Sequence, residues 1–248
     1  MLADRVTVSI VSHGQGMLVI DLLRDFERYC STDIEVILTL NLPEDLAFSV
    51  DGFAFPVRLI RNPLPKGFGA NHNAAFKHVI TAWFCVLNPD IRLQGDPFPA
   101  LLSVLRAPEI GIVAPLIRNP AGTIEDSARK YPTPMGILRK ALGRARLPDY
   151  DIRDTPLQVD WLAGMFLVLR TETFALARGF DEGYFLYYED VDLSWRLRGK
   201  GLAAMLVPAA QAVHDARRQS HRNMRYLVWH ICSMLRFFAK RVFSSSGR

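Results

Sequence analysis

The sequence has few cysteines and no long hydrophobic segment, and each absence excludes a class of protein. Its three cysteines, Cys30, Cys85 and Cys232, are far apart in 248 residues and form no Cys-x-x-Cys pair, which argues against a disulfide framework and against zinc fingers. The apolar run Ala163–Leu169 is far shorter than the roughly 20 residues needed to span a bilayer. Charged residues at positions 4 and 5 lead directly into a strand-like run, so no signal peptide is predicted. We therefore expect a cytoplasmic protein.

Charge is unevenly distributed along the chain. The formal net charge is +5, from 30 basic and 25 acidic residues. Eight basic residues and no acidic residue lie between Ala216 and Arg248, which leaves 22 basic and 25 acidic residues in the preceding positions. A mildly acidic body without a nucleic-acid-binding motif argues against a nucleic-acid partner. The basic tail instead indicates an anionic partner such as a membrane surface.

Alternating strand-like and helix-like segments predict an α/β fold for the first half of the chain. Short apolar runs that end at turn residues predict strands at Val6–Val11, Ile34–Leu40, Val57–Arg61 and Trp83–Leu87, with helices at Met17–Tyr29 and Ala70–Ile80. Continuous apolar strands separated by helices are typical of a mostly parallel sheet that is covered on both faces. Ligands of such sheets bind beyond the carboxyl ends of the strands.

The second half of the chain is less regular. We predict strands at Ile110–Leu116, Val159–Arg170 and Leu202–Val207, helices at Thr171–Arg178 and Glu189–Gly199, and a long loop or hairpin at Pro120–Pro134. The segment Arg129–Arg146 carries six basic residues and no acidic residue. Two interpretations remain open for it: a solvated loop, or a loop that closes over a substrate diphosphate or an anionic acceptor.

The tail from Arg222 to Phe243 has the strongest helical periodicity in the chain. At about 100° per residue, one face collects Leu227, Ile231, Leu235, Phe238 and Val242, and the opposite face collects Arg222, Arg225, Trp229, Arg236 and Lys240. The pattern predicts a basic amphipathic helix. Either its apolar face packs on the body while the basic residues are solvated, or the helix lies in an anionic membrane interface. A homodimer is compatible with both alternatives.

Two glycine-containing loops are candidates for phosphate binding. Gly14-Gln15-Gly16 and Gly67-Phe68-Gly69 each begin a Gly-x-Gly pattern but lack the third glycine of a dinucleotide-binding fingerprint. The sequence contains no Gly-Lys-Ser/Thr, which excludes a Walker loop. A dehydrogenase of the Rossmann type and a P-loop nucleotidase are therefore disfavoured.

Two acidic motifs follow predicted strands or aromatic segments. Asn88-Pro89-Asp90 directly follows a buried strand, so Asp90 is either part of a turn or a ligand for a divalent cation on a diphosphate. Glu189-Asp190-Val191-Asp192 follows the aromatic run at 184–188. These carboxylates either cap a helix or include a general base whose pKa is raised among the aromatic side chains. His214, after the last predicted strand, is a candidate metal ligand if Asp90 binds a metal.

In this order the motifs resemble a family 2 glycosyltransferase with the GT-A fold, in particular the branch that contains bacterial rhamnosyltransferases. The resemblance runs from about Val6 to Ser220. It rests on Leu87–Asp90, Trp161–Leu167, Gly179–Glu182, Phe185–Asp192 and His214 followed by Ser220. It implies a catalytic domain at residues 1–220 and a basic amphipathic helix and tail at residues 221–248.

The resemblance implies transfer of a sugar, with rhamnose as the candidate, from a nucleotide diphosphate donor to an acceptor hydroxyl, with inversion at the anomeric carbon. It assigns Asp190 as the general base with Glu189 beside it, and Mg²⁺ or Mn²⁺ to Asp90 and His214. The implied donor-binding residues are Ser12, His13, Asn41, Lys66, Gly67, Asn71, Asn88, Asp90 and Trp161. The donor is expected to be dTDP- or UDP-linked. The acceptor is expected to be a saccharide or lipid-linked saccharide of a cell-surface polysaccharide, which suits a peripheral position on the inner face of the cell membrane.

One segment departs from the family pattern. After the second strand the family shows an Asp-x-Ser-x-Asp-like segment that contacts the nucleotide, whereas this chain has Leu40-Asn41-Leu42-Pro43-Glu44-Asp45. Asn88 also stands where the family has the first acid of its metal-binding motif. The alternative function is therefore a non-catalytic nucleotide-sugar-binding or scaffold protein that retains the fold.

Overall fold

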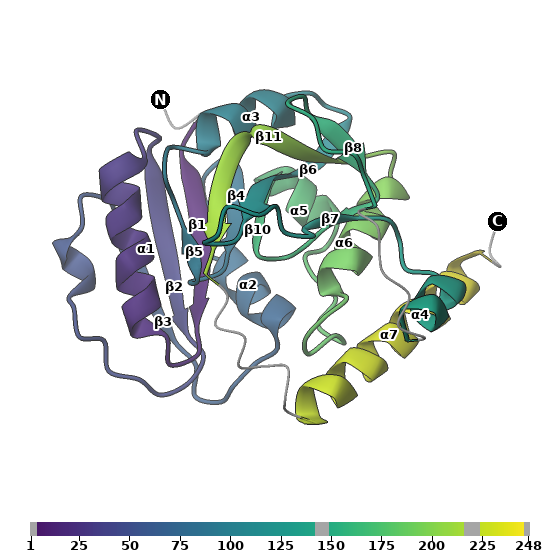
Figure 1. Ribbon diagram of the computed structural model, residues 1–248. Coiled ribbons are helices and arrows are strands. Elements are labelled where there is room, and N and C mark those ends of the chain that lie inside the picture. Colours follow the sequence, from purple (N-terminus) through teal and green to yellow (C-terminus); the bar gives the residue numbers. More distant parts are fainter. Residues whose placement is uncertain (1–3, 142–148, 216–223, 246–248) are drawn as a thin grey trace.

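A central sheet with helices on both faces forms the body of the molecule (Figure 1). The computed structural model describes residues 4–141, 149–215 and 224–245, apart from the side chains of residues 138–141 and 244–245. In the first half the elements are β1 (Val6–Ser12), α1 (Gly16–Tyr29), β2 (Ile34–Leu40), η1 (Val50–Gly52), β3 (Val57–Arg61), α2 (Phe68–Phe76), β4 (Trp83–Leu87), β5 (Ile91–Arg92), α3 (Phe98–Leu105) and β6 (Ile110–Arg118).

The second half contains shorter strands and the C-terminal helix. Its elements are β7 (Ala128–Arg129), α4 (Pro134–Ala141), β8 (Leu157–Val159), β9 (Trp161–Leu162), β10 (Phe166–Arg170), α5 (Thr171–Leu176), α6 (Glu189–Arg198), β11 (Ala203–His214) and α7 (Met224–Ser245). Within the described residues the main sheet has the order β3-β2-β1-β4-β10-β6-β11-β5, with β8 on β11, and β7 and β9 form a separate two-stranded sheet.

The direction of the strands determines where a ligand meets the sheet. Strand β1 pairs in parallel with β2 and β4, β2 pairs in parallel with β3, and β10 is inserted antiparallel between β4 and β6. The loops that follow β1, β2 and β4 therefore lie along one edge of the sheet. The α/β architecture with a mostly parallel sheet and flanking helices is confirmed.

The core explains why the first-half strands were predictable. Every residue of β1 and β4 is buried, as expected for central strands covered on both faces. Helix α1 buries Leu18, Val19, Leu22, Leu23 and Phe26 against this sheet, which is the spacing of an amphipathic helix. The strands predicted at Ile34–Leu40, Val57–Arg61 and Trp83–Leu87 have these bounds in the structure.

Several predictions for other segments are wrong. Val159–Arg170 is not one strand, because β9 leaves the main sheet to pair with β7 and a turn at residues 163–165 separates it from β10. The strand predicted at Leu202–Val207 continues to His214 past an irregularity between Val207 and Gln211. The helix predicted at Ala70–Ile80 is Phe68–Phe76, and helices α3 and α4 were not predicted.

Helix α7 packs with the face opposite to the one that hydrophobicity predicts. Ser233 and Phe237 are buried against the body. The apolar face is largely exposed: Leu227 is 51%, Ile231 41%, Leu235 60% and Val242 62% accessible. The alternative in which this apolar face packs on the body is therefore wrong. None of the helices in the described part of the chain is long and apolar enough to cross a membrane.

Candidate active site

A cavity of about 1890 Å³ lies at the carboxyl edge of the parallel strands. Its lining includes the ends of β1, β2 and β4 on one side and residues of β7, β9, α6 and α7 on the other. Of the predicted site residues, His13, Asn41, Lys66, Asn88, Asp90, Trp161, Glu189 and Asp190 line this cavity. Ser12, Gly67, Asn71 and His214 lie behind the lining and support it through the contacts described below.

Asn41 fixes the loop that carries Lys66. Its Oδ1 accepts hydrogen bonds from the Lys66 backbone N–H (2.8 Å) and from Asn62 Nδ2 (2.8 Å), and its Nδ2 donates to the Lys66 carbonyl (2.9 Å). Asn71 Nδ2 donates to the carbonyls of Lys66 and Gly67 from the other side. Because a buried amide needs its partners satisfied, this network sets the position of Lys66 at the cavity wall.

Ser12 and Gly67 also shape the donor side of the cavity. Ser12 Oγ accepts a hydrogen bond from the Gln15 N–H (3.0 Å) and so closes the turn after β1. Gly67 lies so close to the backbone of Phe185 that a Cβ on Gly67 would lie 2.6 Å from the Phe185 carbonyl oxygen. The Phe68 N–H donates to that carbonyl (2.9 Å), so the Lys66–Gly67 loop is joined to the segment that precedes α6.

Asp90 faces His214 across the carboxyl edge of β4. His214 Nε2 lies 3.3 Å from Asp90 Oδ2, and its Nδ1 lies 2.7 Å from Glu125 Oε2. Burial alone would lower the pKa of His214, but hydrogen bonds and charge from Asp90 and Glu125 outweigh burial and raise the pKa to about 9. In this state His214 is an imidazolium between two carboxylates, and it can coordinate a metal ion only after it loses a proton.

The side chains around Asp90 fit a divalent cation whose remaining ligands come from a substrate. Asp90 Oδ1 is buried and has no hydrogen-bond partner. Among the described residues, no group of three or more His, Cys, Asp or Glu side chains could hold a metal ion without further ligands. Mg²⁺ is commonly bound by one or two carboxylates together with substrate phosphates and water. Asp90, with His214 beside it, provides that partial set.

Glu189 and Asp190 open helix α6 on the other side of the cavity. Asp190 Oδ2 accepts a hydrogen bond from the Gly164 N–H (2.9 Å), and its Oδ1 accepts one from the Val191 N–H (2.8 Å). Burial raises the pKa of Asp190, against the effect of these two N–H groups and of nearby Arg129. Glu189 is 4% exposed and its Oε2 has no partner. Burial and the charge of Asp190 raise the pKa of Glu189 well above its ordinary value.

The turn that precedes α6 is strained. Tyr187 and Tyr188 both have a φ of 69°, a left-handed conformation that is costly for aromatic residues. The two residues lead directly into Glu189 and Asp190, and both line the cavity. The strain therefore occurs where the chain turns two carboxylates toward the cavity.

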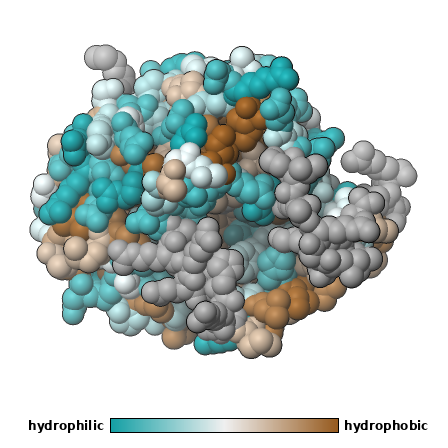
Figure 2. All heavy atoms as spheres, viewed as in Figure 1, coloured by the Kyte–Doolittle hydropathy of each residue, from teal (hydrophilic) through white to brown (hydrophobic). Residues whose placement is uncertain are grey.

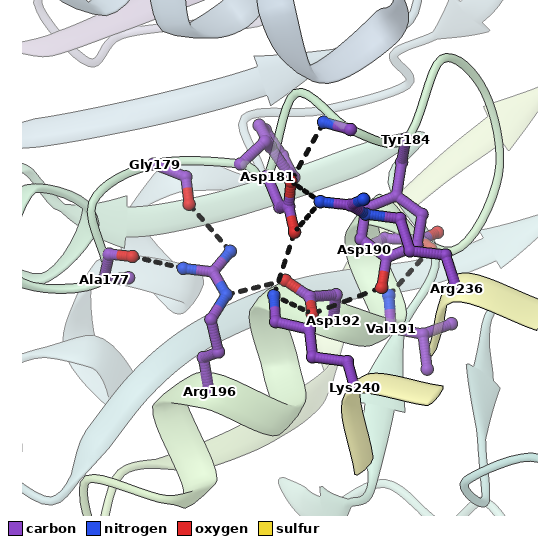
Figure 3. Close-up of polar contacts among 12 residues, drawn as sticks. Ala177, Gly179, Asp181, Tyr184, Asp190, Val191, Asp192, Arg196, Arg236 and Lys240 are labelled. Atoms are coloured by element: carbon purple, nitrogen blue, oxygen red, sulfur yellow. Dashed lines mark hydrogen bonds and ion pairs between the residues drawn. The ribbon is translucent and has the colours of Figure 1, made fainter. Parts of the chain in front are cut away.

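An ion-pair network joins α6 to α7 behind Asp190 (Figure 3). Lys240 Nζ lies 2.6 Å from Asp192 Oδ1 and 3.0 Å from Asp181 Oδ2, and Arg236 donates to both Asp181 oxygens. Arg196 Nε lies 2.6 Å from the fully buried Asp192 carboxylate. Burial alone would raise the pKa of Asp181, but the Gly183 N–H, Lys240 and Arg236 outweigh it and lower the pKa to about 2. These pairs are the reason why the basic face of α7 meets the body.

Some residues of the site were not predicted from the sequence. Glu125 reaches His214 from a loop 89 positions away and belongs to no recognisable motif. Arg129 was considered only as part of the basic segment, for which a solvated loop and a loop over the substrate were both open; it lines the cavity, and its guanidinium lies 5.3 Å from the centre of the Trp161 ring. Arg225 and Trp229 of α7 line the cavity as well. The side chains of Arg139 and Lys140 and all of Arg144, Arg146 and Ser220 fall outside the described residues.

The mostly parallel sheet with flanking helices is the fold of the GT-A glycosyltransferases. Two solved structures share the fold. GalNAc-T7 with UDP, GalNAc and Mn²⁺ superimposes with a TM-score of 0.67 at 16% identity, covering 88% of this chain and 45% of that one. The mannosyltransferase PcManGT from Pyrobaculum calidifontis, in complex with GDP-Man and Mn²⁺, gives 0.65 at 17% identity, covering 94% and 65%.

Sequence comparison is more specific. Rhamnosyltransferase WbbL of Escherichia coli (strain K12) is 31% identical over 72% of this chain and 73% of its own length. The N-acetylglucosaminyl-diphospho-decaprenol L-rhamnosyltransferase of Mycobacterium tuberculosis is 35% identical over 97% of this chain and 86% of its own length. No family model matches. The chain belongs to the rhamnosyltransferase-like glycosyltransferases of family 2, the enzymes that build cell-surface polysaccharides.

Proposed function

We propose that this protein is an inverting, metal-dependent rhamnosyltransferase that transfers its sugar from a dTDP- or UDP-linked donor to a lipid-linked saccharide. The observation that carries the proposal is the geometry of Asp190, a raised-pKa carboxylate fixed by the Gly164 N–H at the wall of the cavity. The catalytic domain in this proposal is residues 1–220, and residues 221–248 form the helix and tail.

The proposed reaction has one proton transfer and one substitution. The acceptor hydroxyl loses its proton to Asp190 while its oxygen forms a bond to the anomeric carbon of the donor sugar. The bond from that carbon to the diphosphate oxygen breaks on the opposite face, and the nucleoside diphosphate leaves with the electron pair. A divalent cation at Asp90 and His214 would neutralise charge on this leaving group. Lys66 lies on the same side of the cavity and supplies a further positive charge.

Basic and aromatic residues support a lipid diphosphate as the acceptor. Arg129, Lys130 and Arg225 line the Asp190 side of the cavity together with Trp161 and Trp229. Guanidinium and ammonium groups bind phosphate oxygens, and aromatic faces pack against sugar rings. The name of the Mycobacterium tuberculosis relative includes a diphospho-decaprenol acceptor, which is the same chemistry.

A lipid-linked acceptor places the enzyme at a membrane surface, and we propose the cytoplasmic face. The three cysteines are all free thiols, as is usual in a reducing compartment.

A transfer assay tests the proposal. The full chain is incubated with radiolabelled dTDP-rhamnose or UDP-sugars, Mn²⁺ and a short polyprenyl-diphosphate saccharide, and the labelled lipid is extracted. We expect transfer from one donor, no transfer in excess EDTA, and a product of inverted anomeric configuration by NMR. The alternative function, a scaffold that retains the fold, predicts that the donor binds but is neither transferred nor hydrolysed.

A further inference from the structure

The outer face of α7 is a stripe of exposed apolar side chains. Its members lie on one side of the helix: Met224, Leu227, Val228, Ile231, Leu235 and Val242, all at least 41% exposed. In Figure 2 hydrophobic residues gather at the lower right, where Figure 1 places α7. A contiguous stripe of exposed apolar side chains marks an interaction surface.

Specific contacts of the opposite face fix the rotation of α7, so the outward direction of the stripe is not accidental. Phe237 is fully buried against Tyr188 and Trp195, and Ser233 Oγ donates to the Leu186 carbonyl (2.9 Å). Together with the ion pairs of Arg236 and Lys240 to Asp181, these contacts fix the rotation of the helix. The apolar stripe is therefore presented outward by specific interactions.

A second cavity adjoins the stripe at its C-terminal end. It has a volume of about 950 Å³ and lies between α7 and the segments of α5 and α6. Its lining includes Arg178, Arg196, Lys200 and Arg241, with Phe238 and Val242 of α7, and no acidic residue. Arg196 is neutralised by Asp192, whereas Arg178 and Lys200 are exposed and have no ion pair within the described residues. The cavity thus combines positive charge with an apolar wall.

We propose that α7 docks this protein on an anionic phospholipid bilayer, with the apolar stripe in the interface and a lipid phosphate in the cavity between α7, α5 and α6. Helices with one apolar face and flanking basic residues bind such surfaces, and each basic residue near an anionic leaflet strengthens binding.

Charge favours a bilayer over a second copy of the chain as the occupant of the stripe. Arg178 and Lys200 are exposed in the cavity beside the stripe. Lipid phosphates can pair with them, whereas α7 of a second copy has no acidic residue that could do so.

The docking also orients the active site. Arg225 and Trp229, from the first turns of α7, line the active-site cavity, while Leu227, Ile231 and Leu235 of the same helix face outward. A lipid-linked acceptor in the bilayer would therefore reach the cavity along α7. This consequence rests on the proposed function; binding of the helix to lipid does not.

Vesicle co-sedimentation of the full chain tests the proposal without any activity measurement. Phosphatidylcholine vesicles with and without phosphatidylglycerol are the probes. We expect sedimentation with the anionic vesicles and a partition coefficient lower by about tenfold or more for the Ile231→Glu/Leu235→Glu variant. The control is Leu64→Glu/Ile80→Glu, which makes the same change at exposed positions of the body (74% and 82% accessible) and should bind like the wild type.

A second pair of variants tests the cavity. Arg178→Gln/Lys200→Gln should lower partition onto anionic vesicles by roughly tenfold while leaving binding to neutral vesicles unchanged. Arg24→Gln/Lys77→Gln removes the same charge from exposed positions elsewhere and should have no such effect. Equal binding of the Ile231→Glu/Leu235→Glu variant and the wild type would overturn the proposal. A stable dimer in light scattering that this variant dissociates, without vesicle binding by the wild type, would overturn it in favour of self-association.

Discussion

Asp90 and Asp190 line the same cavity, yet their surroundings are opposite in character. Asp90 faces a histidine that is itself shared with Glu125, and hydrogen bonds and charge from these two carboxylates raise the pKa of His214 to about 9. Asp190 adjoins a buried Glu189 with an unpartnered oxygen, and burial raises the pKa of both carboxyls. One side of the cavity places a carboxylate beside a histidine with a raised pKa, and the other side holds a carboxyl whose own pKa is raised by burial.

This difference follows from what each carboxylate contacts rather than from residue type. Asp90 follows a central strand and meets the end of β11 across the sheet edge, where His214 supplies positive charge. Asp190 begins a helix among aromatic residues, and its fixed partners are backbone N–H groups of Gly164 and Val191. A metal ligand needs permanent ionisation, whereas a general base works best with a pKa near the operating pH.

The largest expected effect is on the proton-accepting side. Asp190→Asn keeps the size of the side chain but cannot accept the acceptor proton, so kcat should fall by about 10²–10⁴-fold. Donor affinity, measured by calorimetry with the nucleotide sugar and Mn²⁺, should stay within about twofold. Asp154→Asn, an exposed residue, is the matched control. Wild-type turnover in Asp190→Asn would contradict the assignment of Asp190 as the group that accepts the acceptor proton.

The next largest effect on turnover is expected from Asp90, on the side of the cavity that faces His214. Asp90→Asn removes a carboxylate whose Oδ1 has no protein partner, and turnover should fall by about 10²-fold because the leaving diphosphate loses its counter-charge. Binding of Mn²⁺ in the presence of the nucleoside diphosphate, followed by electron paramagnetic resonance, should weaken in parallel. Asp51→Asn, on the exposed turn η1, should change neither. Intact Mn²⁺ binding in Asp90→Asn would remove Asp90 from the ligand set.

A smaller effect on stability and turnover is expected from the ion pairs of Lys240, which lie behind Asp190. Lys240→Met breaks the contacts to Asp181 and to the fully buried Asp192, which should lower the free energy of unfolding by about 1.5–3 kcal/mol. Because these contacts join α7 to the helix that begins with Asp190, kcat should also fall a few-fold while KM for the donor is unchanged. Lys240→Arg should restore much of both, and Lys77→Met, at an exposed position, should have no effect. A loss of stability with unaltered kcat would confine Lys240 to a structural role.

Much of this arrangement could be predicted from the sequence, and the exceptions have physical causes. Strands such as Trp83–Leu87 were predictable because central parallel strands are apolar throughout. Asp90 and Asp190 were predicted as site residues because each belongs to an acidic motif that directly follows a predicted strand or the aromatic run at 184–188. Glu125 was missed since its partner His214 lies 89 positions away, and no local pattern records such a contact. Periodicity left two alternatives open for α7, and the structure excludes packing through the apolar face. Ion pairs to Asp181 and Asp192, which periodicity does not encode, hold the basic face against the body.

The smallest expected effect is on stability, and it comes from Glu189. In the unfolded chain this carboxyl has a pKa of about 4.3. In the native state burial and the charge of Asp190 raise its pKa well above that value. Between the two values the native state binds more protons than the unfolded state, so this group lowers stability as pH rises.

Glu189→Gln removes the titration while keeping the shape of the side chain. Its Tm should exceed that of the wild type at pH 8, and each 1 kcal/mol of relief corresponds to about 2–4 °C in a chain of this size. The difference should shrink as the pH falls below about 4, where the wild-type carboxyl is protonated in both states. Glu109→Gln, at an exposed position, should run parallel to the wild type at every pH. A Tm difference for Glu189→Gln that stays constant between pH 4.5 and 8 would mean that Glu189 is ionised in the native state, and the contrast between the two sides of the cavity would then rest on Asp190 alone.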